Sequence, residues 1–496
     1  MKRFVSLLIL CSLISTLLVP SGTAAIKPGS TCKKLNSIST VSGLKYTCSK
    51  QGKKLIWVKA KVEKAKVEPA IDASPYLTVK DLYAPRDFEF SNGALYKVKL
   101  SFEANTKYTK PEVELVFKVD SGKWELPSQE IRLRPTVESF STVETSTTFT
   151  ADFKLNARLP IGQWRIEFAD LKYGTDQILK IPTREVNLSR TAYGSNDAKP
   201  LEPIANTEYV SFKSKKVERF VWPGKFVAFQ TISKEYDPVI MGRIVNAFDK
   251  AYQSYREITG YTPSPSRQYK NLLVITEMSA DEVGCGAGCG YLGATGIELQ
   301  TGLFNRLYNG VKLYDQYDQA AFYELGRNFW NYASYRSVLK GEAVSQKWFD
   351  ANTTGFAVYM RFLTMNINEI PGGPWDNGKG VAWDAFYSEM KNLAYRQRDE
   401  PGYTFTNTFE AGRPPYSGPL SVNDFWSSVL LYFAPIGEEK AFTKTFLANL
   451  SSRPPARSTA SGVQNFVDAI SLTLGKSIDS EFYSTLKFGD AKSITN

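Results

Sequence analysis

The side chains that could do chemistry in this chain are carboxylates, tyrosines, serines, lysines and cysteines, because its 496 residues include no histidine. This absence excludes Ser-His-Asp triads, Cys-His pairs, imidazole general bases and histidine-ligated zinc. Carboxylate catalysis, Ser-Lys or tyrosine bases, all-oxygen metal sites and a protein without catalysis all remain. Among the carboxylates, Glu324 has the most informative surroundings.

The segment around Glu324, residues 318–333 with the sequence DQAAFYELGRNFWNYA, predicts an amphipathic helix. Apolar residues recur at positions i, i+4, i+8 and i+11 and form one buried stripe of Ala321, Leu325, Phe329 and Tyr332. Tyr323, Glu324 and Arg327 project from a neighbouring face. The two faces predict two roles, one in the core and one at a site.

The pentapeptide from Tyr323 to Arg327, YELGR, resembles the HExxH motif of zinc peptidases with both histidines replaced. HExxH on a helix places two imidazoles one turn apart on the same metal, and the glutamate beside them is the general base. Downstream, WFDANTTGFA at residues 348–357 resembles the second helix of the gluzincin peptidases, in which a glutamate before Gly-Phe-Ala is the third zinc ligand. Thr354 holds that position here.

Two further segments resemble gluzincins in the same order along the chain. The stretch that begins with YSGPL at residues 416–420 resembles the one that carries the transition-state tyrosine, so Tyr416 is the candidate for that role. Residues 290–300 lie where these enzymes have the edge strand that pairs with substrate. This position makes Gly293, Ile297 and Glu298 candidate binding residues.

The resemblance covers roughly residues 208–490. It implies a thermolysin-like α/β lobe over 208–345, a helical lobe over 346–496 and a cleft between them that binds a peptide or a glycan.

By position, the same resemblance makes Glu324 the vestigial base and identifies the lost zinc ligands as Tyr323, Arg327 and Thr354. A phenol, a guanidinium and a hydroxyl cannot hold zinc, and the guanidinium has no lone pair to donate. The resemblance therefore implies a pseudoenzyme without metal or cofactor. In it, the charge of Arg327 replaces that of the metal and pairs with Glu324 at i, i+3.

Three other interpretations remain open. If the resemblance of YELGR to HExxH is a coincidence, Tyr323 and Arg327 are ordinary helix residues. The chain is an active hydrolase, a peptidase or a glycosidase, if Glu324 works without histidine-bound zinc. A glycosidase needs a second carboxylate, for which the candidates are Asp315, Asp318, Glu342 and Asp350. The chain is a structural cell-wall-associated protein if the cleft is closed.

The cysteines predict an exported protein with two disulfides. Removal of residues 1–25 takes away Cys11 and leaves four cysteines, which allow three connectivities. Local pairing is the simplest, and it joins Cys32 to Cys48 and Cys285 to Cys289. Zinc bound by all four is the alternative, but the pairs lie roughly 240 residues apart and an oxidising compartment favours disulfides.

Residues 1–25 predict a secretory signal peptide, because Lys2 and Arg3 precede an apolar run and the small residues SGTAA. Lipidation at Cys11 is disfavoured, since Leu10 is too large for the position before a lipidated cysteine. No later stretch reaches the roughly 18 apolar residues that span a bilayer. We therefore expect a secreted or cell-envelope-associated protein.

The positive charge of the chain lies near its N-terminus. The formal net charge is +11, and residues 26–68 alone contain eleven lysines and two glutamates. This segment indicates contact with an anionic cell-wall polymer or membrane surface, although the lysines could instead only solubilise a small module. Nucleic acid is not an expected partner, since no recognition motif is present.

Composition divides the mature chain into a basic cysteine-paired module at 26–59, a linker at 60–74, a β segment at 75–193 and an α/β region from 208 onward. The module resembles the lysine-rich, cysteine-paired modules that precede larger domains in secreted actinobacterial proteins.

The β segment alternates β-branched or aromatic residues with polar ones, as in YKVKLSF at 96–102. We expect an immunoglobulin-like sandwich there. The predicted fold class is multidomain, with a small disulfide module, the sandwich, a thermolysin-like α+β lobe and a C-terminal helical lobe.

Overall fold

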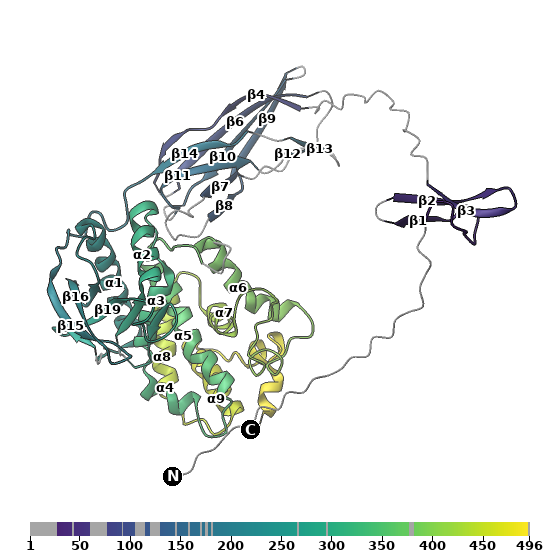
Figure 1. Ribbon diagram of the computed structural model, residues 1–496. Coiled ribbons are helices and arrows are strands. Elements are labelled where there is room, and N and C mark those ends of the chain that lie inside the picture. The colour runs from purple at the N-terminus through teal and green to yellow at the C-terminus, as the bar shows by residue number, and fades with distance from the viewer. Residues whose placement is uncertain are drawn as a thin grey trace, which may run out of the picture. The chain divides into compact units, whose positions relative to one another are not determined.

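The computed structural model describes residues 27–41, 44–59, 77–91, 93–104, 115–119, 129–143, 146–156, 159–168, 171–173, 177–179, 182–264, 267–293, 296–375 and 381–494. The predicted signal peptide, Cys11 and the predicted linker lie outside these residues. The chain forms two compact units that divide after residue 74 (Figure 1). No helix in the described part of the chain is long and apolar enough to cross a membrane.

The smaller unit contains one three-stranded antiparallel sheet of β1 (Ile38–Val41), β2 (Leu44–Gln51) and β3 (Lys54–Lys59). A disulfide joins Cys32 to the fully buried Cys48, which confirms the predicted pairing. A covalent link suits a unit too small to bury a large core. All the lysines among its described residues are exposed: Lys27, Lys33, Lys34, Lys45, Lys50, Lys53, Lys54 and Lys59.

Two sheets form the β-rich part of the larger unit. One has the strand order β4 (Leu77–Tyr83), β6 (Leu95–Ala104), β10 (Ser146–Lys154) and β9 (Val137–Val143). The other has the order β5 (Asp87–Glu89), β14 (Arg184–Ser189), β11 (Gly162–Phe168), β7 (Leu115–Val119) and β8 (Gln129–Leu133). Strands β12 (Leu171–Tyr173) and β13 (Gln177–Leu179) form a separate hairpin.

The two sheets share one core, to which both contribute buried side chains such as Phe149 of β10 and Trp164 of β11. Along β6, Tyr96 and Val98 are buried while Lys97 between them is exposed. Successive side chains of a strand point to opposite faces, so this alternation places one face of β6 in the core.

A mixed sheet lies at the start of the α/β region. Its strand order is β15 (Ile204–Val210), β16 (Lys216–Pro223), β17 (Val227–Thr231), β19 (Leu272–Met278), β21 (Ile297–Gln300) and β20 (Gly288–Gly290), with β18 (Gln268–Tyr269) also paired to β19. Strands β17, β19 and β21 are parallel, whereas β20 lies antiparallel to β21 at the edge. The coarse prediction of a mixed α and β protein with several sheets is confirmed.

Helices cover this sheet and continue to the end of the described chain. They are α1 (Pro238–Thr259), α2 (Thr301–Tyr314), α3 (Gln319–Asn328), α4 (Tyr332–Leu339), α5 (Gln346–Ile367), α6 (Trp383–Asp399), α7 (Val422–Phe433), α8 (Glu439–Ser451) and α9 (Thr459–Leu474). A π-helical turn (Ser480–Thr485) and a 3₁₀ turn (Gly489–Ser493) follow. One hydrophobic core joins the sheet to the last helices, from Phe229 on β17 to Phe466 on α9.

The predicted single helix over 318–333 is wrong at its end. Helix α3 ends at Asn328, and the side chain of Asn331 accepts a hydrogen bond from the Ser334 N–H at 3.4 Å and caps α4. The apolar spacing continues across the break, because Phe329 stays fully buried between the two helices. Periodicity alone therefore could not reveal the cap.

Asp315 joins the β-rich part to the helices of the larger unit. Its fully buried carboxylate accepts hydrogen bonds from the guanidinium groups of Arg190 and Arg243 and from the Tyr193 N–H, the last at 2.8 Å. Arg190 directly follows β14, and Arg243 lies on α1. A buried carboxylate needs such partners, so this cluster fixes the end of β14 against α1 and the residue that follows α2.

Candidate functional site at Glu324

Helix α3 places Glu324 against the edge of the mixed sheet. The helix begins at its N-cap residue Asp318, whose side chain accepts a hydrogen bond from the Ala320 N–H. Ala321 and Leu325 are fully buried on one face, as their spacing predicts. The same spacing turns Glu324 toward β20, where its side chain is 9% exposed.

Glu324 binds the backbone of the edge strand. Its Oε2 accepts a hydrogen bond from the Gly290 N–H at 2.6 Å. Burial raises the pKa of Glu324 to about 7, although the positive charge of Arg327 and the Gly290 N–H both act to lower it. The carboxyl group therefore changes its charge near neutral pH.

Arg327, one turn further along α3, binds the other polar group of the same residue. Its Nε donates to the Gly290 carbonyl oxygen at 2.5 Å, and its Nη1 donates to the Tyr323 hydroxyl at 2.9 Å. The predicted ion pair with Glu324 is absent among the described residues. Both side chains hold the backbone of Gly290 instead, which separates their charged groups.

This arrangement, the Gly290 clamp, consists of Glu324, Arg327 and the backbone N–H and C=O of Gly290. Gly290 lies opposite Ile297 of β21 in the sheet register, yet its N–H and C=O both bond to α3. An exposed sheet edge normally offers these groups to another strand. At Gly290, side chains occupy them.

The clamp depends on glycine in the edge strand. A Cβ atom on Gly290 would lie 2.4 Å from the carbonyl oxygen of Glu324, which is rigid helix backbone. A Cβ on Gly288 would lie 3.2 Å from the Glu324 Cγ. Only glycine lets the helix approach the strand closely enough for both hydrogen bonds.

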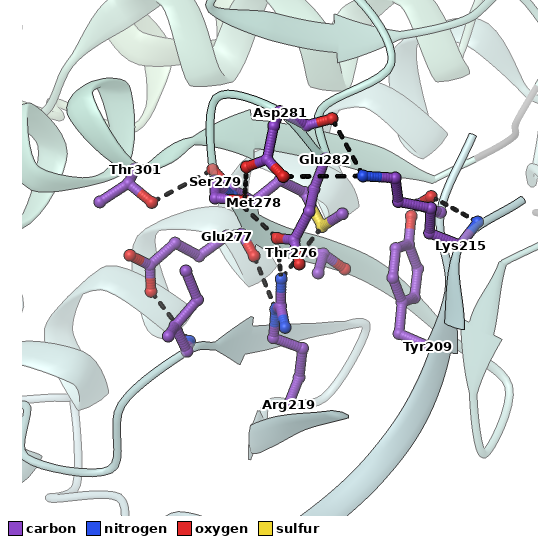
Figure 2. A network of polar contacts seen from close by, with 12 residues as sticks. Tyr209, Lys215, Arg219, Thr276, Glu277, Met278, Ser279, Asp281, Glu282 and Thr301 are labelled. Carbon is purple, nitrogen blue, oxygen red and sulfur yellow. Dashed lines mark hydrogen bonds and ion pairs between the residues drawn. The ribbon is translucent and has the colours of Figure 1, made fainter. Parts of the chain in front are cut away.

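A polar network holds the loop that leads into β20 (Figure 2). Arg219 on β16 donates from Nε to the Glu277 carbonyl oxygen at 2.8 Å and from Nη2 to the Glu282 carboxylate at 2.7 Å. The Glu282 carboxylate also accepts from the Ser279 N–H at 3.0 Å. Because Arg219 is only 5% exposed, these bonds fix the loop from inside the protein.

The second predicted disulfide, Cys285 to Cys289, is also confirmed. It closes a short loop directly before the clamp, and Cys289 itself is a residue of β20. The loop and the strand are therefore held both by the disulfide and by the network around Arg219.

Two of the predicted binding residues lie inside the protein. Ile297 is fully buried in the core. Glu298 is fully buried on the opposite face, where its Oε1 accepts from the Tyr209 hydroxyl at 3.0 Å and its Oε2 accepts from the Gly284 N–H at 2.8 Å. Gly293 lies in the loop after β20 with a φ of 84°.

Thr354 and Tyr416 lie on other elements. Thr354 is half-buried on α5, one turn before Ala357, and a Cβ on Gly326 of α3 would lie 3.2 Å from the Ala357 Cα. Tyr416 precedes α7, and its hydroxyl donates to Glu389 of α6. The structure thus joins Tyr323, Glu324 and Arg327 at one point, places Thr354 on the helix that packs there, and gives Tyr416 partners on α6.

Carboxylates that could assist Glu324 have other partners or lie on the surface. Asp315 binds two arginines, and Asp318 caps α3 and accepts from Arg306 Nε at 2.9 Å. Asp350 accepts from the Gln346 side chain at 2.6 Å, and Glu342 is exposed. The described part of the chain holds no group of three or more acidic or cysteine side chains that could bind a metal ion.

The sequence interpretation missed Gly288 and Arg361, and it placed Gly290 in the edge strand without giving it a role of its own. Arg361 on α5 is 7% exposed, lies 5.8 Å from the centre of the Tyr323 ring, and binds Gln319. The GCG sequence of β20 was the available signal for the two glycines, since small residues allow close backbone approach. Nothing in the spacing of α5 distinguished Arg361 from a surface arginine.

Wild-type protein is expected to lose stability relative to Glu324→Gln as pH rises from about 4.5 to about 7. A carboxyl whose pKa is raised on folding, here from 4.5 to about 7, stabilises the fold below its unfolded-state pKa, and this contribution disappears through the folded-state pKa. The change is up to about 3 kcal/mol. Denaturant unfolding of both proteins from pH 4 to 8 measures it, and parallel stability curves would contradict the assignment.

No protein-family model matches this chain, and no curated protein matches it. The gluzincin resemblance therefore depends on the residues of this chain and on their order. Within the site, Glu324 and Arg327 bind the N–H and the C=O of one residue of the sheet edge, Gly290.

Proposed function

We propose that this protein is a secreted, non-catalytic relative of the gluzincin peptidases that acts by binding at or outside the cell envelope. The Gly290 clamp carries the proposal. A peptidase of this type needs a general base that is free to activate water and an edge strand that is free to pair with substrate. Here Glu324 and Gly290 bind each other, and Arg327 occupies the carbonyl.

The side chains at the three ligand positions do not fit zinc. Arg327 carries a permanent charge and no lone pair, so it repels a cation. Burial raises the pKa of Tyr323, which keeps the phenol neutral, and its oxygen already accepts from Arg327. Thr354 offers only a neutral hydroxyl. We therefore assign no catalytic step to a metal.

Two features support the proposed gluzincin-like arrangement of helices and edge strand. The strand beside the motif helix is the antiparallel edge of a mixed sheet, as a substrate-pairing strand must be. The helix with Thr354 packs closely on α3 at Gly326. The two-lobed thermolysin-like arrangement and an immunoglobulin-like topology for the two β sheets belong to the same proposal.

We also propose that the smaller unit contacts an anionic polymer of the envelope. Its described residues include eight exposed lysines and no aspartate or glutamate, so no carboxylate among these residues compensates the charge. The disulfide between Cys32 and Cys48 indicates an oxidising compartment, which fits a location outside the cytoplasm.

The mature chain is expected to hydrolyse neither unfolded protein nor neutral glycans faster than Glu324→Gln does. The carboxylate would have to leave the Gly290 N–H before it could act as a base. Release of peptides and of reducing ends, measured on identically purified wild type and variant, tests this. Turnover in the wild type that disappears in Glu324→Gln would establish the active-hydrolase interpretation instead.

The combined substitutions Tyr323→His, Arg327→His and Thr354→Glu are expected to create a site for one zinc ion. Two imidazoles at i, i+4 and a carboxylate on α5 would then restore the ligand set of the resemblance. Bound zinc is measured after dialysis, with circular dichroism as the check on folding. The matched control carries Tyr323→His and Arg327→His but keeps Thr354, and it should bind zinc more weakly. Equal binding by both folded variants would contradict the placement of α5.

Charge-neutral variants of the smaller unit are expected to lose affinity for polyanions. Replacement of Lys33, Lys34, Lys53 and Lys54 by glutamine should lower the salt concentration at which the mature chain elutes from a polyphosphate resin, because exposed charges act through screened Coulomb attraction. Replacement of four exposed lysines of the larger unit is the control. Equal effects of both variants would indicate only a dependence on total charge.

A further inference from the structure

A tight turn in the smaller unit carries two lysines and two exposed apolar side chains. This segment, the 33–38 turn, has the sequence KKLNSI. Leu35 is 48% exposed and Ile38 is 68% exposed, and Lys33 and Lys34 beside them are also exposed. A single exposed apolar side chain needs no explanation, whereas two of them close in sequence and next to two cations give one segment both apolar and positive character.

Hydrogen bonds hold the 33–38 turn to the folded unit. The Ser37 N–H and hydroxyl both donate to the Lys34 carbonyl oxygen, at 3.2 Å and 2.7 Å. Asn36 between them is in the left-handed conformation, with a φ of 61°, which asparagine tolerates better than most residues. The Asn36 N–H donates to the Cys48 carbonyl oxygen at 2.8 Å, and the Cys48 N–H donates to the Ser37 carbonyl oxygen at 2.9 Å. The turn is thus ordered before a partner binds, so little ordering opposes binding.

The strand register explains why Ile38 points outward. Ile38 of β1 lies opposite Thr47 of β2, and residues paired in this way share one face of the sheet. Thr47 precedes Cys48, whose fully buried side chain is linked to Cys32. Successive side chains of a strand point to opposite faces, so Ile38 lies on the face away from the disulfide.

The net charge indicates an anionic partner outside the chain. The described residues of the smaller unit include eight exposed lysines and no acidic residue. Residues 1–25 and 26–68 carry net charges of +2 and +9, which account for the whole net charge of +11. Residues 69–496 are therefore neutral overall and supply no surplus of carboxylates to the smaller unit.

An anionic lipid surface suits both kinds of side chain in the turn. A polymer of phosphates or uronates pairs with lysines but gives aliphatic side chains no apolar environment. A bilayer offers headgroup charges to the lysines and, directly beneath them, an acyl region to the aliphatic side chains. The combination of Lys33 and Lys34 with Leu35 and Ile38 therefore favours a bilayer over a polymer as the partner of this turn.

We propose that the 33–38 turn docks on the surface of an anionic lipid bilayer, with Lys33 and Lys34 at lipid phosphates and Leu35 and Ile38 between the headgroups. The inference rests on the envelope location and the lysine charge proposed above, and it adds an apolar contact that a polymer does not provide. If the bilayer contact fails, the proposed attraction of the lysines to polyphosphate still stands.

Co-sedimentation of the mature chain with vesicles tests the contact. We expect binding to equimolar phosphatidylglycerol and phosphatidylcholine, and little binding to phosphatidylcholine alone. The double variant Leu35→Ser, Ile38→Ser should bind the anionic vesicles roughly tenfold more weakly, because two aliphatic side chains lose an apolar contact. The matched control is Ile436→Ser, Leu472→Ser, since these side chains are 95% and 53% exposed on the larger unit. The control should bind like the wild type.

The lysines and the depth of insertion are tested separately. Lys33→Gln and Lys34→Gln should each weaken vesicle binding roughly fivefold at low salt, and less at high salt, because headgroup attraction is screened. In Leu35→Trp, lipids brominated near the headgroup end of their acyl chains should quench the added fluorescence, with the wild type as the background.

Two controls separate the lipid contact from other causes. On the polyphosphate resin, Leu35→Ser, Ile38→Ser should elute at the wild-type salt concentration, because its charge is unchanged. Its thermal unfolding curve should also match that of the wild type, because both side chains are exposed.

Four results would overturn the proposal. The first is equal binding of the wild type to both kinds of vesicle. The second is equal binding of the anionic vesicles by the two serine variants, which would leave only a contact through charge. The third is earlier elution of Leu35→Ser, Ile38→Ser from polyphosphate, which would assign the apolar pair to a polymer contact. The fourth is a lower unfolding temperature of that variant, which would show that the pair packs against protein.

Discussion

Two hydrogen bonds to Gly290 fix helix α3 to the edge of the mixed sheet. Glu324 and Arg327, three residues apart on α3, accept from and donate to the same residue of the edge strand. In this way side chains complete a sheet edge that another strand would otherwise complete. The contact requires glycine in β20, because the helix lies close to the strand. The adjacent disulfide and the network around Arg219 hold the loop that leads into this strand.

Arg327 does not neutralise Glu324 by direct contact. Its guanidinium donates to the Gly290 carbonyl oxygen and to the Tyr323 hydroxyl. Glu324 accepts from one backbone donor, and burial outweighs the nearby charge of Arg327 and raises the pKa of its carboxyl group. The Gly290 N–H can bond to an oxygen of Glu324 in either form of the carboxyl group, but the ionised form costs stability because it is buried.

The parts of the site that the sequence could predict are those fixed by spacing within one element. Helical periodicity placed Ala321 and Leu325 in the core and Tyr323, Glu324 and Arg327 on one side, and the cysteine spacing predicted both disulfides. The clamp joins residues 34 apart in sequence, and it depends on the register of β20 against β21, which no local pattern encodes. The end of α3 at Asn328 could not be predicted for a related reason. The apolar spacing continues past this residue, and only the side-chain cap of the next helix marks the break.

The closed edge at Gly290 leaves no backbone group of this residue for another strand or a ligand, because its N–H and C=O both bond to α3. The cluster at Asp315 follows the same physical rule. There, two arginines and the Tyr193 N–H bind one buried carboxylate and join the end of β14 to α1 and to the residue after α2. In both places a charged side chain takes up polar groups that burial would otherwise leave without partners. The helix that carries Glu324 and Arg327 is therefore part of the support that holds the larger unit together.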